Sequence, residues 1–161
     1  MTELYPFSSN IIELEKFRYH YLDEGSGGEP LLMLHGNPTW SFYYRNLILG
    51  LKDSYRCVVP DHMGMGFSDK PQNYPYTLSQ HIDNLEKLLD YLKLDNITLV
   101  IHDWGGPIGM GFAVRHPERI KRLVIFNTAA FLSREIPLSL KLCRLPGLGP
   151  IAIRMLNAFP R

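Results

Sequence analysis

Cysteine is scarce in this chain, and neither sign of charge dominates it. The two cysteines, Cys57 and Cys143, stand far apart among 161 residues and match no metal-ligand spacing. We therefore expect them to be free thiols of the kind that cytoplasmic proteins carry. The 17 Lys and Arg residues nearly balance the 16 Asp and Glu residues, so no charged field favours nucleic acid or an anionic surface. These shortages argue against a disulfide framework, a cysteine metal site and a nucleic acid partner.

Long apolar runs are also lacking. No stretch reaches the roughly 18 consecutive apolar residues that a membrane span requires, so we expect no transmembrane segment. The chain starts Met1-Thr2-Glu3-Leu4, without the basic start and apolar core of an export signal, which predicts a cytoplasmic protein. No ligand cluster or phosphate-binding glycine pattern stands out, so no metal and no cofactor is expected. The composition is instead that of a globular core, with 45% hydrophobic and 20% charged residues.

The hydrophobic pattern alternates between short strands and helices. Residues 11–22 predict two strands that pair as a hairpin, and Thr77 is a good N-cap for a helix over 78–92. Further strands are predicted over 31–34, 56–60, 97–101 and 123–126, and a second helix over 105–116. Because each strand is short and apolar on both faces, we expect an α/β fold with a mostly parallel sheet and helices on both sides.

The pattern changes near residue 132. Residues 136–145 and 151–159 predict short helices, separated by the turn-forming residues 146–150. We therefore expect residues 1–131 to form the sheet and its helices, and residues 132–161 to begin a helical cap inserted over the sheet.

Three predicted strands end in polar and glycine-rich segments. Residues 35–38 read His-Gly-Asn-Pro, residues 61–66 begin with Asp61, and residues 102–106 read His-Asp-Trp-Gly-Gly. Ligands of such sheets bind at the carboxyl ends of the strands. We expect the three segments to converge on an active site.

Asp103 stands where an apolar strand passes through two glycines into a helix. This is the layout of a nucleophile elbow, with a carboxylate where serine is usual. A carboxylate needs no deprotonation and displaces a leaving group from saturated carbon, which leaves an alkyl ester on the enzyme. Cleavage of that ester by water calls for a histidine and an acid that orients it. We expect Asp103 to be the nucleophile, although an aspartate here also suits a helix N-cap.

The segments at 35–38 and 102–106 resemble those of the haloalkane dehalogenase family of α/β-hydrolases. The resemblance implies an α/β-hydrolase fold with Asp103 as nucleophile, and Trp104 and Asn37 as donors of N–H groups to the leaving halide. Uncharged donors suit a weakly basic anion in a dry pocket. The backbone N–H groups of Asn37 and Trp104 are expected to face the ester oxygen. The other residues of both segments are expected to shape the site: His35, Gly36, Pro38, His102, Gly105 and Gly106.

One branch of that family fits better than the rest. Residues 5–7, 56–62, 64–71 and 127–131 are similar to the β-lactone decarboxylases of bacterial olefin biosynthesis, which are classed with the third dehalogenase subfamily. Those enzymes convert a long-chain β-lactone to an alkene and CO₂, which implies a small apolar substrate. The resemblance implies that the second subfamily has a catalytic Glu where this chain has Asn127. It also implies that the first subfamily has no Asn at the position of Asn37. The third subfamily remains.

No histidine follows His116, so the base of such an enzyme is missing. We expect the sequence to be the N-terminal part of a larger enzyme, and the 161 residues alone to be inactive. A haloalkane dehalogenase and an epoxide hydrolase stay as alternatives, although Asn37 argues against the epoxide hydrolase. A truncated chain without function is a further alternative. A split enzyme whose complementary chain supplies the remaining strands ranks below it.

Overall fold

The computed structural model describes residues 4–130 and, beyond them, residues 138, 141, 145–147, 149, 151 and 153. The chain divides into two compact units, Met1–Ala130 and Phe131–Arg161. The helices predicted over 136–145 and 151–159 fall largely outside the described residues, as does Cys143, so the helical cap stays a prediction.

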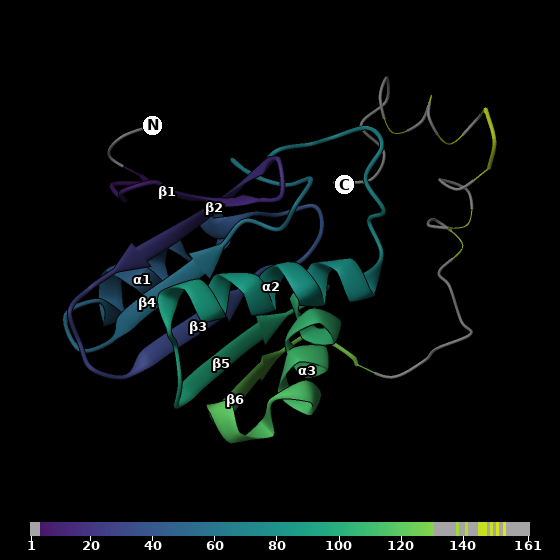
Figure 1. Cartoon of the computed structure of the whole chain (residues 1–161). Helices are drawn as coiled ribbons and strands as arrows, with labels where there is room; N and C mark the ends of the chain where they lie inside the picture. The colour runs from purple at the N-terminus through teal and green to yellow at the C-terminus, as the bar shows by residue number, and fades with distance from the viewer. Residues whose placement is uncertain are drawn as a thin grey trace. The chain divides into compact units, whose positions relative to one another are not determined.

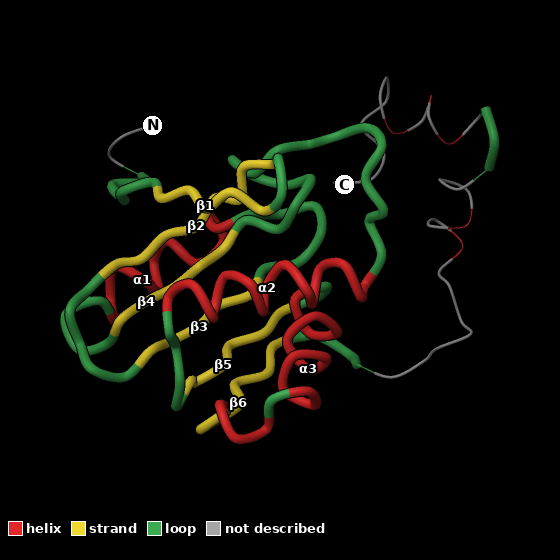
Figure 2. Tube along the Cα trace, in the orientation of Figure 1, coloured by secondary structure: helices red, strands yellow, loops and turns green. Residues whose placement is uncertain are grey.

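Within residues 4–130 the chain forms a six-stranded sheet in the order β1-β2-β4-β3-β5-β6 (Figures 1 and 2). The strands are β1 (Asn10–Leu14), β2 (Phe17–Glu24), β3 (Pro30–Leu34), β4 (Arg56–Pro60), β5 (Ile97–His102) and β6 (Ile120–Phe126). The pairs β1/β2 and β2/β4 are antiparallel, and the other three pairs are parallel. The predicted hairpin and the mostly parallel sheet are therefore confirmed.

Three helices cover the two faces of this sheet. Figure 1 shows α2 (Leu78–Leu92) and α3 (Gly105–Arg115) on one face and α1 (Arg45–Leu51) on the other. The helix α2 begins as predicted, because the side chain of Thr77 accepts a hydrogen bond from the backbone N–H of Gln80. Short 3₁₀ turns at Ser41–Tyr44 and Pro117–Arg119 precede α1 and β6. None of the helices described here is long and apolar enough to span a bilayer.

The hydrophobic core forms one layer on each face of the sheet. In β3, Leu32 and Leu34 pack with Leu85 of α2 and with α3, whereas Leu31 and Met33 pack with Ile48 of α1. This alternation follows from the two-residue period of a strand. The central strands are thus buried on both faces, as the sequence predicts.

Three details of the sequence prediction are wrong. The helix α1 was not expected, and β6 starts at Ile120 rather than at residue 123. The strand β6 is also largely exposed, with Ile125 58% accessible, so not every strand is buried on both faces. The reason is its place at the border of the described sheet, where β5 is its partner and α3 packs against β5 and β3.

Candidate active site

The predicted site segments 35–38 and 102–106 lie side by side at the carboxyl ends of β3 and β5. These two strands are parallel neighbours, although α1, β4 and α2 separate them in the sequence. From β3 the chain runs to β4 on one side and then returns past β3 to β5 on the other, which creates the switch point where α/β sheets bind ligands. The sheet order therefore brings Asn37 and Asp103 together.

The backbone at Asp103 adopts an uncommon conformation. Its φ angle is +49°, in the left-handed region that costs a residue with a side chain about 1–3 kcal/mol. The carbonyl oxygen of Asp103 accepts hydrogen bonds from the N–H of Gly106, at 3.0 Å, and from the hydroxyl of Thr128, at 2.6 Å. We call residues 102–106 the elbow. Its geometry is that of a sharp strand-to-helix turn that presents one side chain to solvent.

The carboxylate of Asp103 faces the segment that follows β3. Its Oδ1 accepts a hydrogen bond of 2.8 Å from the backbone N–H of Asn37. A Cβ atom on Gly36 would overlap the Cβ and Oδ1 of Asp103, so glycine is needed for this close approach. The peptide bond between Asn37 and Pro38 is cis. The Asn37 N–H, which is expected to face the ester oxygen, thus already points at the carboxylate.

The two glycines of the elbow also lie where a side chain would not fit. A Cβ atom on Gly105 would meet the carbonyl of Leu34, and one on Gly106 would overlap the hydroxyl of Thr128. The elbow therefore packs directly on the end of β3 and on the segment after β6. Thr128 was not predicted as a site residue, because a hydroxyl in a loop has no distinguishing sequence pattern.

Asn37 and Trp104 line a common hollow with a volume of about 320 Å³. Trp104 is 38% exposed, so its ring is accessible from solvent in the described part of the chain. The rest of the lining comes from α2 and the segments after β4 and before α2: Met63, Gly64, Met65, Tyr76 and His81. The third predicted strand end, residues 61–66, therefore reaches the site. The contributions of Tyr76 and His81 carried no sequence signal.

His35 connects two of the converging segments. Its Nδ1–H donates to the carbonyl of Gly36 at 2.8 Å, and its Nε2 accepts the backbone N–H of His62 at 3.1 Å. Burial lowers the pKa of His35, which keeps this imidazole neutral. Because both ring nitrogens are engaged, His35 is placed to shape the loop rather than to activate water. His102 instead stacks on the ring of Tyr43, with centroids 4.5 Å apart.

Asp61 fixes the segment that follows β4. It is fully buried, and its carboxylate accepts the N–H groups of Ser41 at 2.7 Å and Phe67 at 2.9 Å, with His20 Nδ1 at 2.9 Å. Burial alone would raise the pKa of Asp61, but these partners outweigh burial and lower it. The ionised carboxylate holds together the segments on either side of the hollow. Among the described residues, no group of His, Cys, Asp and Glu is arranged to hold a metal ion.

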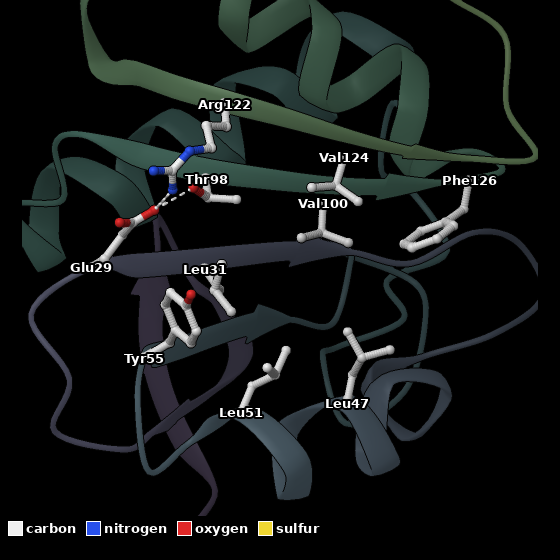
Figure 3. Close-up of a pocket in the computed structure, with 10 residues that line it drawn as sticks. All are labelled: Glu29, Leu31, Leu47, Leu51, Tyr55, Thr98, Val100, Arg122, Val124 and Phe126. Atoms are coloured by element: carbon white, nitrogen blue, oxygen red, sulfur yellow. Dashed lines mark hydrogen bonds and ion pairs between the residues drawn. The ribbon is translucent and has the colours of Figure 1, made fainter.

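A second depression in the surface lies away from the elbow. It is an apolar groove of about 250 Å³ between α1 and β6, and Figure 3 shows the ion pair of Glu29 and Arg122 beside Thr98 at one end of it. None of the predicted site residues lines this groove. The hollow, and not the groove, is lined by Trp104, which follows Asp103 in the chain, and by Asn37, whose N–H contacts the Asp103 carboxylate.

Comparisons with known proteins agree with this fold. The chain is 55% identical to the cis-3-alkyl-4-alkyloxetan-2-one decarboxylase of Shewanella oneidensis, over 97% of this chain and 51% of that protein. It is 44% identical to haloalkane dehalogenase 2 of Mycobacterium bovis, over 78% of this chain and 44% of that protein. The haloalkane dehalogenase DatA from Agrobacterium tumefaciens C58 superimposes with a TM-score of 0.82 at 30% identity, over 94% of this chain and 54% of that structure.

The chain spans about half the length of these relatives. Residues 29–142 match the model of the alpha/beta hydrolase fold. This match covers the parallel strands, the elbow and the helices that flank them. The chain belongs to the alpha/beta hydrolase fold family.

Proposed function

We propose that this chain carries the nucleophile of an enzyme that converts a long-chain β-lactone to an alkene and CO₂. The observation that carries the proposal is the left-handed elbow at Asp103, whose carboxylate accepts the N–H of Asn37. A strained backbone at an exposed carboxylate is typical of a functional residue. The similarity to cis-3-alkyl-4-alkyloxetan-2-one decarboxylases supports the choice of substrate.

The reaction needs no added reactant. The carboxylate of Asp103 attacks the saturated ring carbon that is bonded to the ring oxygen, which forms an alkyl ester and breaks that carbon–oxygen bond. The ring opens to a free carboxylate on the neighbouring carbon. Loss of CO₂ then breaks a carbon–carbon bond, its electron pair forms the double bond, and Asp103 leaves as a carboxylate. The substrate atoms are divided between the alkene and CO₂, and the nucleophile is regenerated.

Haloalkane dehalogenation is a second candidate, supported by the donors that share the hollow. Asn37 and Trp104 supply uncharged N–H groups, which suit a halide better than a strongly basic leaving group. Attack by Asp103 breaks the carbon–halogen bond, and the halide leaves with the electron pair. This route also requires a base to activate water. His35 has both ring nitrogens engaged and does not serve as that base. Without such a base the reaction stops at the ester.

The first step is tested by incubating the chain with 1-bromohexane and measuring its intact mass. We expect the mass to rise by one hexyl group, one bromide to be released per chain, and peptide mapping to locate the ester on Asp103. Asp103→Asn should abolish this product. Asp53→Asn removes an exposed carboxylate outside the site and should leave it unchanged. Labelling that persists in Asp103→Asn, or its absence from the unsubstituted chain, would contradict the proposed nucleophile.

The choice between the two reactions requires a second substrate. The missing base, on which the expectation of an inactive chain rests, serves to activate water, and the lactone reaction consumes no water. A cis-3,4-dialkyl β-lactone should therefore yield the corresponding alkene, detected by gas chromatography, and Asp103→Asn should yield none above the uncatalysed reaction. A hexyl ester that forms with 1-bromohexane, combined with an absence of alkene from the lactone, would instead favour the dehalogenase.

A further inference from the structure

Thr128 connects the elbow to the neighbouring strand. It lies two residues after β6, and its hydroxyl donates a hydrogen bond of 2.6 Å to the carbonyl oxygen of Asp103. The strands β5 and β6 are parallel. After a register shift between Ile97 and Thr98 they stay paired up to their ends, where His102 pairs with Phe126. The residue between this end and Thr128 is Asn127, whose φ of +33° turns the chain out of the strand. Two adjacent strands thus end in left-handed residues, and the hydroxyl of Thr128 joins their ends.

The fit between Thr128 and the elbow involves Gly106. A Cβ atom at Gly106 would overlap the hydroxyl oxygen of Thr128 and crowd the rest of its side chain. The Gly106 N–H also donates to the carbonyl of Asp103. This second bond lies within the turn itself and does not hold the turn against the sheet. The bond from Thr128 instead ties the Asp103 carbonyl to the segment that follows β6.

We propose that Thr128 is a positioning residue that holds Asp103 in its left-handed conformation and thereby sets the direction of the carboxylate. This inference rests on the proposed role of Asp103 as nucleophile. The orientation of the Asp103 carbonyl and the φ angle of Asp103 belong to the same turn, so release of the carbonyl allows the residue to relax towards commoner backbone angles. The carboxylate then loses its alignment with the Asn37 N–H and with the reacting carbon atom of a bound substrate.

Two substitutions at Thr128 test this role. Thr128→Val keeps the shape of the side chain and removes the hydroxyl, whereas Thr128→Ser keeps the hydroxyl. We expect Thr128→Val to lower the maximal rate of alkylation by 1-bromohexane about tenfold or more, because small errors in alignment have large effects on rate. The bromohexane concentration that gives half of this rate should stay unchanged, since the hollow itself is intact. Thr128→Ser should restore most of the rate.

The matched control is Thr98→Val. Thr98 donates a hydroxyl hydrogen bond of 2.7 Å to Glu29 near the opposite end of β5, and Glu29 keeps its ion pairs with Lys121 and Arg122. This variant removes a comparable bond from the same sheet and should leave the alkylation rate unchanged. Equal losses in both valine variants, or a loss that Thr128→Ser does not restore, would overturn the proposal.

Hydrogen exchange measured by mass spectrometry provides a readout that does not depend on the reaction. In Thr128→Val, peptides that contain residues 103–106 should exchange faster, while the same peptides in Thr98→Val should match the unsubstituted chain. If the unsubstituted chain is not alkylated, the proposed nucleophile fails, and exchange still shows whether Thr128 holds the elbow. Unchanged exchange at the elbow in Thr128→Val would overturn the positioning role.

Discussion

The nucleophile candidate depends on a close approach between two backbone segments. The N–H of Asn37 reaches the Asp103 carboxylate because Gly36, one residue earlier, has no side chain to separate β3 from the elbow. A left-handed aspartate alone would present its carboxylate to solvent. The glycine allows a hydrogen-bond donor to orient it.

Gly36→Ala should therefore disturb the site more than an ordinary glycine substitution. The added Cβ would overlap Asp103, and we expect the free energy of unfolding to fall by about 1–3 kcal/mol. Alkylation by 1-bromohexane should be lost with it. Gly50→Ala is the matched control, because Gly50 is an exposed position of α1 where a Cβ meets nothing within 4 Å. This variant should raise the free energy of unfolding by about 0.5–1 kcal/mol, since alanine favours a helix more than glycine does. Urea unfolding measures the free energy of unfolding of both variants. An unchanged value in Gly36→Ala would disprove the close approach.

A group of buried histidines beside the site makes the stability of the fold depend on pH. His62 is fully buried, with its ring centroid 4.4 Å from that of His35 and 5.8 Å from that of His81. Burial, followed by the neighbouring imidazoles, lowers the pKa of His62 well below its ordinary value of 6.5. Burial also lowers the pKa of His35 and His81. The folded chain keeps these rings neutral at pH values where the unfolded chain protonates them.

The sign of the effect on stability follows from proton binding. Below about pH 6.5 the unfolded chain binds more protons than the folded chain, so the free energy of unfolding falls as pH falls, by up to about 1.4 kcal/mol per pH unit for each histidine. His62→Phe should flatten this dependence in urea unfolding between pH 7 and 5. Met63→Leu changes a buried neighbour without a titratable group and should keep the original slope. An unchanged slope in His62→Phe would contradict the assignment.

At the scale of elements, the helix α2 shows how local sequence sets a boundary that the site uses. Its start places His81 in the lining of the hollow, and the cap at Thr77 fixes that start. Thr77→Ala removes the acceptor for the Gln80 N–H and should lower the free energy of unfolding by about 1 kcal/mol. Thr77→Ser keeps the hydroxyl and should therefore retain most of this stabilisation. Urea unfolding measures the free energy of unfolding of the two variants. Equal losses in both would show that the hydroxyl does not stabilise the start of α2.

The sequence predicts an element correctly where a local signal and a tertiary requirement coincide. The bounds of α2 agree with its apolar period and its capping residue, and β3, β4 and β5 are apolar runs buried on both faces. The helix α1 escaped prediction because it has seven residues and no capping side chain. The start of β6 was missed because Lys121 and Arg122 interrupt the apolar pattern there.

The same distinction holds for the candidate site. Residues 35–38 and 102–106 were predictable because strand ends of a parallel sheet share one edge. The hydroxyl of Thr128 was not, because its reach to Asp103 depends on the register of β6 and on the turn at Asn127. Tyr76 and His81 enter the hollow through the path of the segment before α2 and the rotation of that helix, neither of which a single sequence specifies.

At the scale of the whole molecule, the described sheet is covered unevenly. The helices α2 and α3 bury the central strands on one face, whereas the groove between α1 and β6 leaves Val124 and Phe126 accessible on the other (Figure 3). The strand β6 also exposes Leu123 and Ile125. Within the described sheet β6 pairs with β5 alone, so one edge of the strand is open as well as apolar. An open apolar edge favours association between chains.

Ile125→Lys should therefore reduce self-association of the chain. A lysine on a border strand opposes pairing with another strand, and Ile125 is 58% exposed, so its replacement disturbs little of the core. Sedimentation velocity over a range of concentrations should show a larger monomer fraction for this variant. Val114→Lys adds the same charge at a site on α3 that is 77% exposed, and it should associate like the unsubstituted chain. If both variants become equally monomeric, the added charge rather than β6 controls association, and if neither changes, the contact lies elsewhere.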